Sequence, residues 1–190
     1  MKLNDARLVG LAFRATSPRY GDLHHTAAMS RSFPGRFNTT DVGAVYVSRE
    51  PQTAVDEHRR RAARDGISLT EMHPRSLFVI DLLLHRVVDL RTREELTAWG
   101  LTPDDVASDD MRRCQEVADV AARLGAEAIR WNSATGAGQS FAIFVERLLP
   151  GSHADVLRAF DLTRAMLAAI ERGALVTTLI PELSAIPLLG

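Results

Sequence analysis

Cysteine and lysine are nearly absent from this chain of 190 residues. Cys114 is the single cysteine, so an internal disulfide is excluded and a reducing cytoplasm is the simplest setting. Lys2 is the single lysine, so arginine carries nearly all of the positive charge. The planar arginine fork suits phosphate and carboxylate groups, although a GC-rich coding bias would produce the same composition.

Long hydrophobic runs and an excess of one charge are also missing. No apolar run reaches the roughly 18 residues that span a bilayer, and the first residues carry Asp5 without a small-residue cleavage site. We therefore expect neither a membrane span nor a signal peptide. The net charge is -1, with basic residues concentrated before residue 65. This asymmetry is compatible with a small anionic ligand, whereas a direct nucleic-acid platform would normally make the whole domain basic.

Strands and helices alternate irregularly along the chain. Hydrophobic patterning predicts strands at 8–15, 43–48, 76–84, 126–131 and 139–148, and helices at 48–66, 92–100, 109–125 and 161–173. The turn-rich stretch 16–26 is expected to be a surface loop. Because the regular rhythm of a parallel sheet is missing, we expect an α+β fold with a curved, largely antiparallel sheet and flanking helices.

We expect one domain over residues 1–190, with the motif-bearing part at about 8–150 and a C-terminal helix and apolar tail at 151–190. The tail after Ala174 has two interpretations. It completes the core, or it docks a partner or a second copy, because an exposed apolar segment would otherwise favour aggregation. We favour association.

One short stretch, "PGRFNTTDVGAVYVSREPQTAVDE", gathers residues of chemical interest. Arg36 follows a glycine that permits a tight turn, Tyr46 lies on the second face of a strand, and Glu57 lies in the second turn of the helix that Pro51 begins. Because that helix directly follows the strand, Tyr46 and Glu57 are expected to face one cleft. Each residue also has a structural interpretation: Arg36 paired to Asp41 or a carbonyl, Tyr46 in the core, or Glu57 paired with an arginine on its own helix.

Together these side chains suit cleavage of a nucleotide's glycosidic bond. Arginine holds a pyrophosphate through charged, bidentate hydrogen bonds. An aromatic ring packs against a base. A carboxylate stabilises the positive charge that develops at the anomeric carbon. When the leaving group is nicotinamide, it departs neutral and one carboxylate can suffice.

The same stretch resembles the signature of the RES domain, a family of bacterial toxins from toxin–antitoxin pairs. The matching positions are Gly35-Arg36-Phe37-Asn38, Tyr46 and Glu57, with Phe13-Arg14 on the first strand and Ser133 in "RWNSATGAGQSFAIF". The sequence departs from the family at Pro34, Phe37 and Thr39-Thr40. Ser140 is the alternative for the serine position.

The resemblance implies an ADP-ribosyltransferase-like fold that binds NAD as its substrate, without a metal. It implies cytoplasmic toxins that split off nicotinamide with water or phosphate as acceptor, and that are silenced by a helix-turn-helix antitoxin in a complex that can be oligomeric. Glu57 would be the catalytic carboxylate, supported by Arg36 and Tyr46. Arg14, Arg36, Tyr46 and Ser133 would bind the dinucleotide. Two alternatives stay open: transfer of ADP-ribose to a cellular protein, and a non-catalytic partner-binding module.

Three other features have ordinary interpretations. His24-His25 is expected to be a loop pair, because no cysteine or carboxylate lies at metal-ligand spacing. Cys114 is expected to be buried on the apolar face of its helix. The basic run His58–Arg64 is expected to be a solvated helix face that could border the anion site.

Overall fold

The computed structural model describes residues 6–133 and 138–186. Residues 134–137, between the predicted strands 126–131 and 139–148, lie outside this range, as do the two ends. Six strands are present in the described residues: β1 (Ala6–Thr16), β2 (Val45–Ser48), β3 (Arg75–Asp89), β4 (Ala128–Asn132), β5 (Gln139–Ile143) and β6 (His153–Leu162). The α-helices are α1 (Leu23–Ser30), α2 (Pro51–Arg64), α3 (Arg93–Ala98), α4 (Pro103–Ala107), α5 (Arg112–Arg123), α6 (Arg164–Glu171) and α7 (Val176–Leu179).

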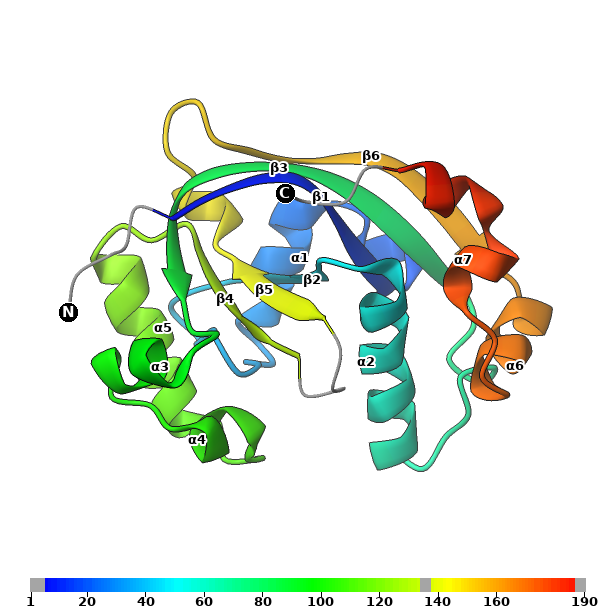
Figure 1. Cartoon of the computed structure of the whole chain (residues 1–190), viewed down its shortest axis with the longest axis horizontal. Helices are drawn as coiled ribbons and strands as arrows, with labels where there is room; N and C mark the ends of the chain where they lie inside the picture. The colour runs from blue at the N-terminus through cyan, green and yellow to red at the C-terminus, as the bar shows by residue number, and fades with distance from the viewer. Residues whose placement is uncertain (1–5, 134–137, 187–190) are drawn as a thin grey trace.

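The strands form one sheet in the order β1-β2-β5-β4-β3-β6, and β1 also pairs with β3. All of the pairings are antiparallel except that of β3 with β4. In Figure 1 the long strands β1, β3 and β6 arch over the molecule, while β2, β4 and β5 run beneath them. The expected curved, largely antiparallel sheet with flanking helices is confirmed.

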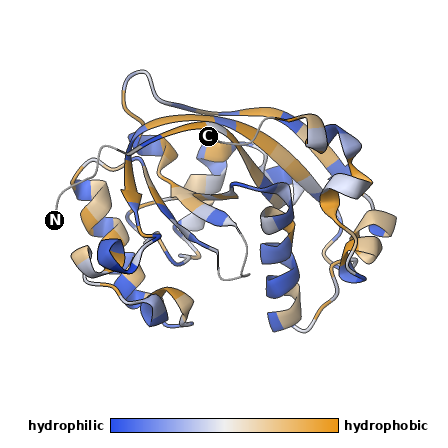
Figure 2. Ribbon diagram, in the orientation of Figure 1, coloured by the Kyte–Doolittle hydropathy of each residue, from blue (hydrophilic) through white to orange (hydrophobic). Residues whose placement is uncertain are grey.

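Buried side chains form three clusters around this sheet. The first lies under α3 and α5 and includes Trp99, Cys114 and Trp131. The second fills the curved sheet and includes Phe78 and Phe141. The third joins α2 to β1, β3 and the C-terminal helices. Figure 2 shows α2 as mainly hydrophilic beside hydrophobic strands, which agrees with an amphipathic helix that packs through one face.

Helices α2 and α3 begin close to where the sequence predicts. Pro51 occupies the first turn of α2, and a proline is tolerated there because its missing N–H would be unpaired anyway. Thr92, the first residue of the predicted helix 92–100, caps α3 in a capping box with Glu95. Helix α6 is capped by Thr163, whose side chain accepts the hydrogen bond from the Met166 N–H.

Three expectations about elements were wrong. The stretch 16–26 is not a loop throughout, because Asp22 accepts a hydrogen bond from the His25 N–H and begins α1, which contains His24 and His25. Strand β6 was missed. The C-terminal tail is not free for association over its described residues, because Val176, Ile180 and Leu183 are buried against the third cluster. No helix in the described residues has the length and apolarity required to cross a bilayer.

Candidate active site

A cavity of about 640 Å³ lies between α2 and the loop that precedes β2. Its remaining walls come from the end of β1, from β2, β4 and β5, and from the link between α4 and α5. Arg14, Arg36, Tyr46 and Glu57 all line it. The structure therefore brings together four of the five predicted site residues, and confirms that Tyr46 and Glu57 face one cleft.

Paired residues of β2, β5 and β4 form the inner wall of this cavity. Ser48 pairs with Ser140 across β2 and β5, and Ser140 pairs with Trp131 across β5 and β4. Residues in register project to the same face of a sheet, and Tyr46, two residues before Ser48, shares that face. Trp131 contacts the Tyr46 ring edge-on, with centroids 6.1 Å apart. The inner wall thus combines two aromatic rings with two hydroxyl groups.

The Tyr46 hydroxyl holds the loop that carries Arg36. It accepts a hydrogen bond from the Phe37 N–H at 2.8 Å and donates one to Asn38 Oδ1 at 3.0 Å. Asn38, which is fully buried, also accepts from the Gly35 N–H at 2.7 Å. A Cβ atom at Gly35 would lie 2.7 Å from the hydroxyl, so glycine is required for this close approach. Burial raises the pKa of Tyr46.

The two predicted arginines are held by backbone carbonyls. Arg14 Nη1 donates to Tyr46 O at 2.8 Å, and burial lowers the pKa of its guanidinium to about 10. Arg36 Nη1 donates to Asp105 O at 3.2 Å. The carbonyl partner considered for Arg36 is therefore present, and the same side chain lines the cavity.

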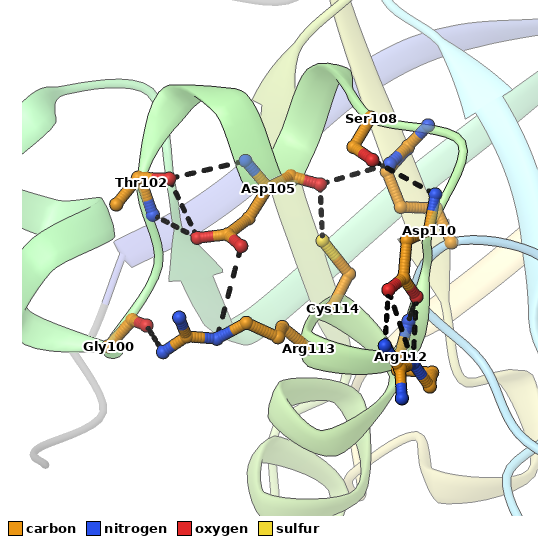
Figure 3. A network of polar contacts seen from close by, with 9 residues as sticks. Gly100, Thr102, Asp105, Ser108, Asp110, Arg112, Arg113 and Cys114 are labelled. Carbon is orange, nitrogen blue, oxygen red and sulfur yellow. Dashed lines mark hydrogen bonds and ion pairs between the residues drawn. The ribbon is translucent and has the colours of Figure 1, made fainter.

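The segment α4–α5 supplies that carbonyl and fixes its position. Figure 3 shows Asp105 at the centre of a network with Thr102, Arg113 and Cys114. Asp105 Oδ2 accepts from the Thr102 N–H at 2.7 Å, and Cys114 Sγ donates to Asp105 O at 3.5 Å. Cys114 is buried as expected, and burial raises the pKa of its thiol. Gln115 of α5 adds a bond from Nε2 to Gly35 O at 3.0 Å, so α4 and α5 each hold the loop at one point.

Glu57 is oriented by a serine that directly follows β4. Ser133 Oγ donates to Glu57 Oε1 at 2.5 Å. Ser133 is buried next to the carboxylate but is not among the residues that line the cavity. Ser140 lines the cavity instead, and its Oγ is buried with no hydrogen-bond partner in the described residues. The two candidate serines therefore occupy different positions, one holding Glu57 and one in the wall.

Helix α2 presents one polar stripe to the cavity. Glu57, Arg60, Arg61 and Arg64 all line it, and their spacing of three, four and seven residues places them on one helix face. His58 also lines the cavity and hydrogen-bonds through Nε2 to Ala15 O. Burial lowers the pKa of His58 to about 4, so the ring is neutral at pH 7. The basic run does border the cavity.

The part of the chain that the structure describes holds no group of three or more histidine, cysteine, aspartate or glutamate side chains placed to bind a metal. The cavity's polar groups include five arginines, several hydroxyls, two carboxylates and the His58 ring. This set of donors fits an anionic organic ligand.

Arg36, Tyr46 and Glu57 all lie within the part of the chain that a family model matches. The RES domain matches residues 11–167 of the chain. The chain belongs to the RES domain family. No curated protein sequence matches it.

A solved structure supports the RES assignment. The chain is similar to the toxin in the crystal structure of the M. tuberculosis MbcT-MbcA toxin-antitoxin complex, with a TM-score of 0.73 and 26% identity. The similarity covers 87% of this chain and 92% of the other.

Sequence reasoning missed two kinds of residue that line the cavity. Trp131 was not selected, although it lies two residues before Ser133 on β4 and packs between Tyr46 and Phe37. Its strand position beside a predicted site serine was the available signal. Arg60 and Arg64 were treated as a group with their neighbours, and helical spacing from Glu57 would have separated them from Arg59, which pairs with Asp56 at 3.1 Å.

Proposed function

We propose that this RES domain is the toxin of a toxin–antitoxin pair and that it cleaves the bond between nicotinamide and ribose in NAD. The observation that carries the proposal is the Glu57 carboxylate. A serine hydroxyl orients it at 2.5 Å, and it lies on the wall of a cavity that also presents arginines and aromatic rings. A carboxylate in this setting is suited to a reaction in which positive charge develops on a sugar.

In the proposed reaction, the bond between ribose C1′ and the pyridinium nitrogen breaks, and its electron pair moves to the nitrogen. Nicotinamide leaves as a neutral molecule, and the ribose becomes an oxocarbenium-like cation. Glu57 stabilises this cation and positions the ribose hydroxyls. Water or phosphate then adds to C1′, and the incoming nucleophile loses a proton when it is water.

The remaining residues bind and orient the dinucleotide. Arg36 projects from a loop that is held by Tyr46, Asn38 and Gln115, so its guanidinium is preorganised for the pyrophosphate. Arg14 is fixed by its hydrogen bond to the Tyr46 carbonyl of β2, and it adds positive charge to the inner wall. Tyr46 and Trp131 offer ring surfaces on which nicotinamide packs.

The similarity to a toxin–antitoxin complex supports an antitoxin partner for this chain. We propose a helix-turn-helix antitoxin that forms an oligomeric complex with it in the cytoplasm. We also propose that the fold is of the ADP-ribosyltransferase type. The curved, largely antiparallel sheet is consistent with such a fold, in which the sheet binds a dinucleotide.

The test is to incubate the purified chain with NAD in the presence and absence of phosphate, and to identify the products by liquid chromatography. We expect free nicotinamide together with ADP-ribose or its 1″-phosphate. Radiolabel that accumulates on a protein acceptor would instead identify an ADP-ribosyltransferase. Absence of nicotinamide release under both conditions would overturn the proposal in favour of a non-catalytic binding module.

A further inference from the structure

The outer part of the cavity differs in character from the inner part. The inner residues, such as Trp131 and Ser140, are buried, whereas Phe33, Arg60 and Arg64 line the cavity and are exposed. Phe33 is 83% exposed, the highest value for a large hydrophobic side chain in the described residues. The cavity therefore has an inner end that contains Glu57 and a separate outer end.

Phe33 is directed by its backbone. Pro34 follows it, and a residue before proline is restricted to extended conformations. The ring is thus presented at the cavity mouth without being packed in the core, at a cost in exposed apolar surface. A flat heteroaromatic ring that stacks on Phe33 would remove this surface from water.

The arginines of α2 extend away from Glu57 along the same helix face. At 1.5 Å per residue, Arg60 lies about 4.5 Å and Arg64 about 10.5 Å along the axis from Glu57. The Arg60 side chain makes no hydrogen bond or ion pair within the described residues, and the Arg64 pair with Asp65 is an exposed one at 3.3 Å. Exposed pairs contribute little and are readily exchanged for a stronger anion.

The net positive charge of the residues that line the cavity is larger than the net negative charge of an oxidised nicotinamide dinucleotide. Among the described residues, five arginines and two carboxylates line it, and His58 is neutral at pH 7. A pyrophosphate carries two negative charges, and the pyridinium of an oxidised nicotinamide dinucleotide offsets one of them. An additional phosphomonoester contributes about -1.5 to -2 at pH 7, which brings the ligand close to the surplus of three arginines.

We propose that the outer end of the cavity is a subsite for the adenosine half of a dinucleotide, and that it selects a 2′-phosphorylated one. Phe33 stacks on the adenine, and Arg60 and Arg64 bind the ribose 2′-phosphate. The substrate class is then NADP in preference to NAD. This inference rests on the proposed function for the identity of the ligand, but the subsite can be tested without any reaction.

The test compares binding of adenosine 2′,5′-bisphosphate and 5′-AMP to the full chain by isothermal titration calorimetry. We expect the bisphosphate to bind at least tenfold tighter. The double variant Arg60→Gln/Arg64→Gln should remove that difference. Arg59→Gln is the matched control, because Arg59 is on the same helix but outside the cavity and should keep the difference. Equal affinity of the wild type for both ligands, or an equal loss in the control, would overturn the subsite.

Phe33 is tested in the same titration. Phe33→Tyr should retain affinity for both nucleotides, whereas Phe33→Leu should weaken both by about the same factor, because the adenine is common to them. Retained affinity in Phe33→Leu would exclude the stacking role.

Nicotinamide release from NAD and from NADP separates this inference from the proposed function. No release from either dinucleotide, with the bisphosphate preference intact, would refute the function and leave the subsite standing. Equal release from both, with equal nucleotide affinities, would support the function and refute the subsite.

Discussion

Tyr46 shows how one residue can serve the site in a way that its position on a strand does not reveal. The sequence placed it on a cavity face and suggested stacking. The structure adds that its hydroxyl fastens the loop from Gly35 to Asn38. Arg36, Tyr46 and Glu57 could be predicted because a short strand and its following helix fix their relative positions. Ser133 was selected only through the resemblance, as a residue that binds the dinucleotide; its bond to Glu57, 76 residues away in sequence, comes from the structure.

At the same residue scale, Tyr46→Phe should destabilise the fold. The variant leaves the Phe37 N–H without its acceptor, and an unsatisfied buried donor costs about 1–3 kcal/mol. Urea unfolding measures the change in the free energy of unfolding. Tyr20→Phe is the control, since no hydrogen bond of the Tyr20 hydroxyl occurs within the described residues. If both variants unfold at the same urea concentration as the wild type, the hydroxyl does not hold the loop.

At the scale of elements, hydrophobic patterning predicted the helices and strands in which apolar residues recur regularly. It missed elements in which they do not. Helix α5 and strand β3 have strong patterns and were found. Strand β6 is exposed over most of its length, so its residues show no alternation of polar and apolar side chains. Helix α1 was not predicted because Pro18, Gly21 and Asp22 are typical of turns. Asp22 is instead the cap of this helix.

The C-terminal helices support α2, which carries Glu57. Gln52 Oε1 accepts a hydrogen bond from the Val176 N–H at 2.9 Å, and Ile180 is 4% exposed. Ile180→Ala should therefore lower the free energy of unfolding by about 2–5 kcal/mol, as measured in urea. Leu175→Ala is the control, because Leu175 is 56% exposed and should shift stability by no more than about 0.5 kcal/mol. Equal effects of the two substitutions would show that the tail does not pack on α2.

At the scale of the whole molecule, stability should depend on pH through His58. Burial lowers its pKa from 6.5 to about 4, with the positive charges of Arg75, Arg14 and Arg61 acting in the same direction. The unfolded chain therefore binds a proton before the folded chain does, and folding stability falls as the pH decreases from about 6.5 to 4. The slope from this group is at most about 1.4 kcal/mol per pH unit.

His58→Gln should remove that slope while keeping a donor for Ala15 O. The measurement is the free energy of unfolding against pH for the wild type, His58→Gln and the exposed control His24→Gln. The curves of the wild type and His24→Gln should fall together below pH 6.5, and that of His58→Gln should be flatter. Three parallel curves would contradict a buried, neutral His58.

The central claim for the whole molecule is that this RES domain cleaves NAD through Glu57. The most direct measurement is the rate of nicotinamide release from NAD by the wild type and by Glu57→Gln, with matched thermal unfolding curves. Gln keeps the shape of the side chain and a partner for Ser133, but it has no negative charge to stabilise the ribose cation. We predict a loss of about 10²- to 10³-fold in rate with an unchanged unfolding temperature, on the scale of removing one main electrostatic stabiliser of a transition state. Equal rates for the two proteins would contradict the account.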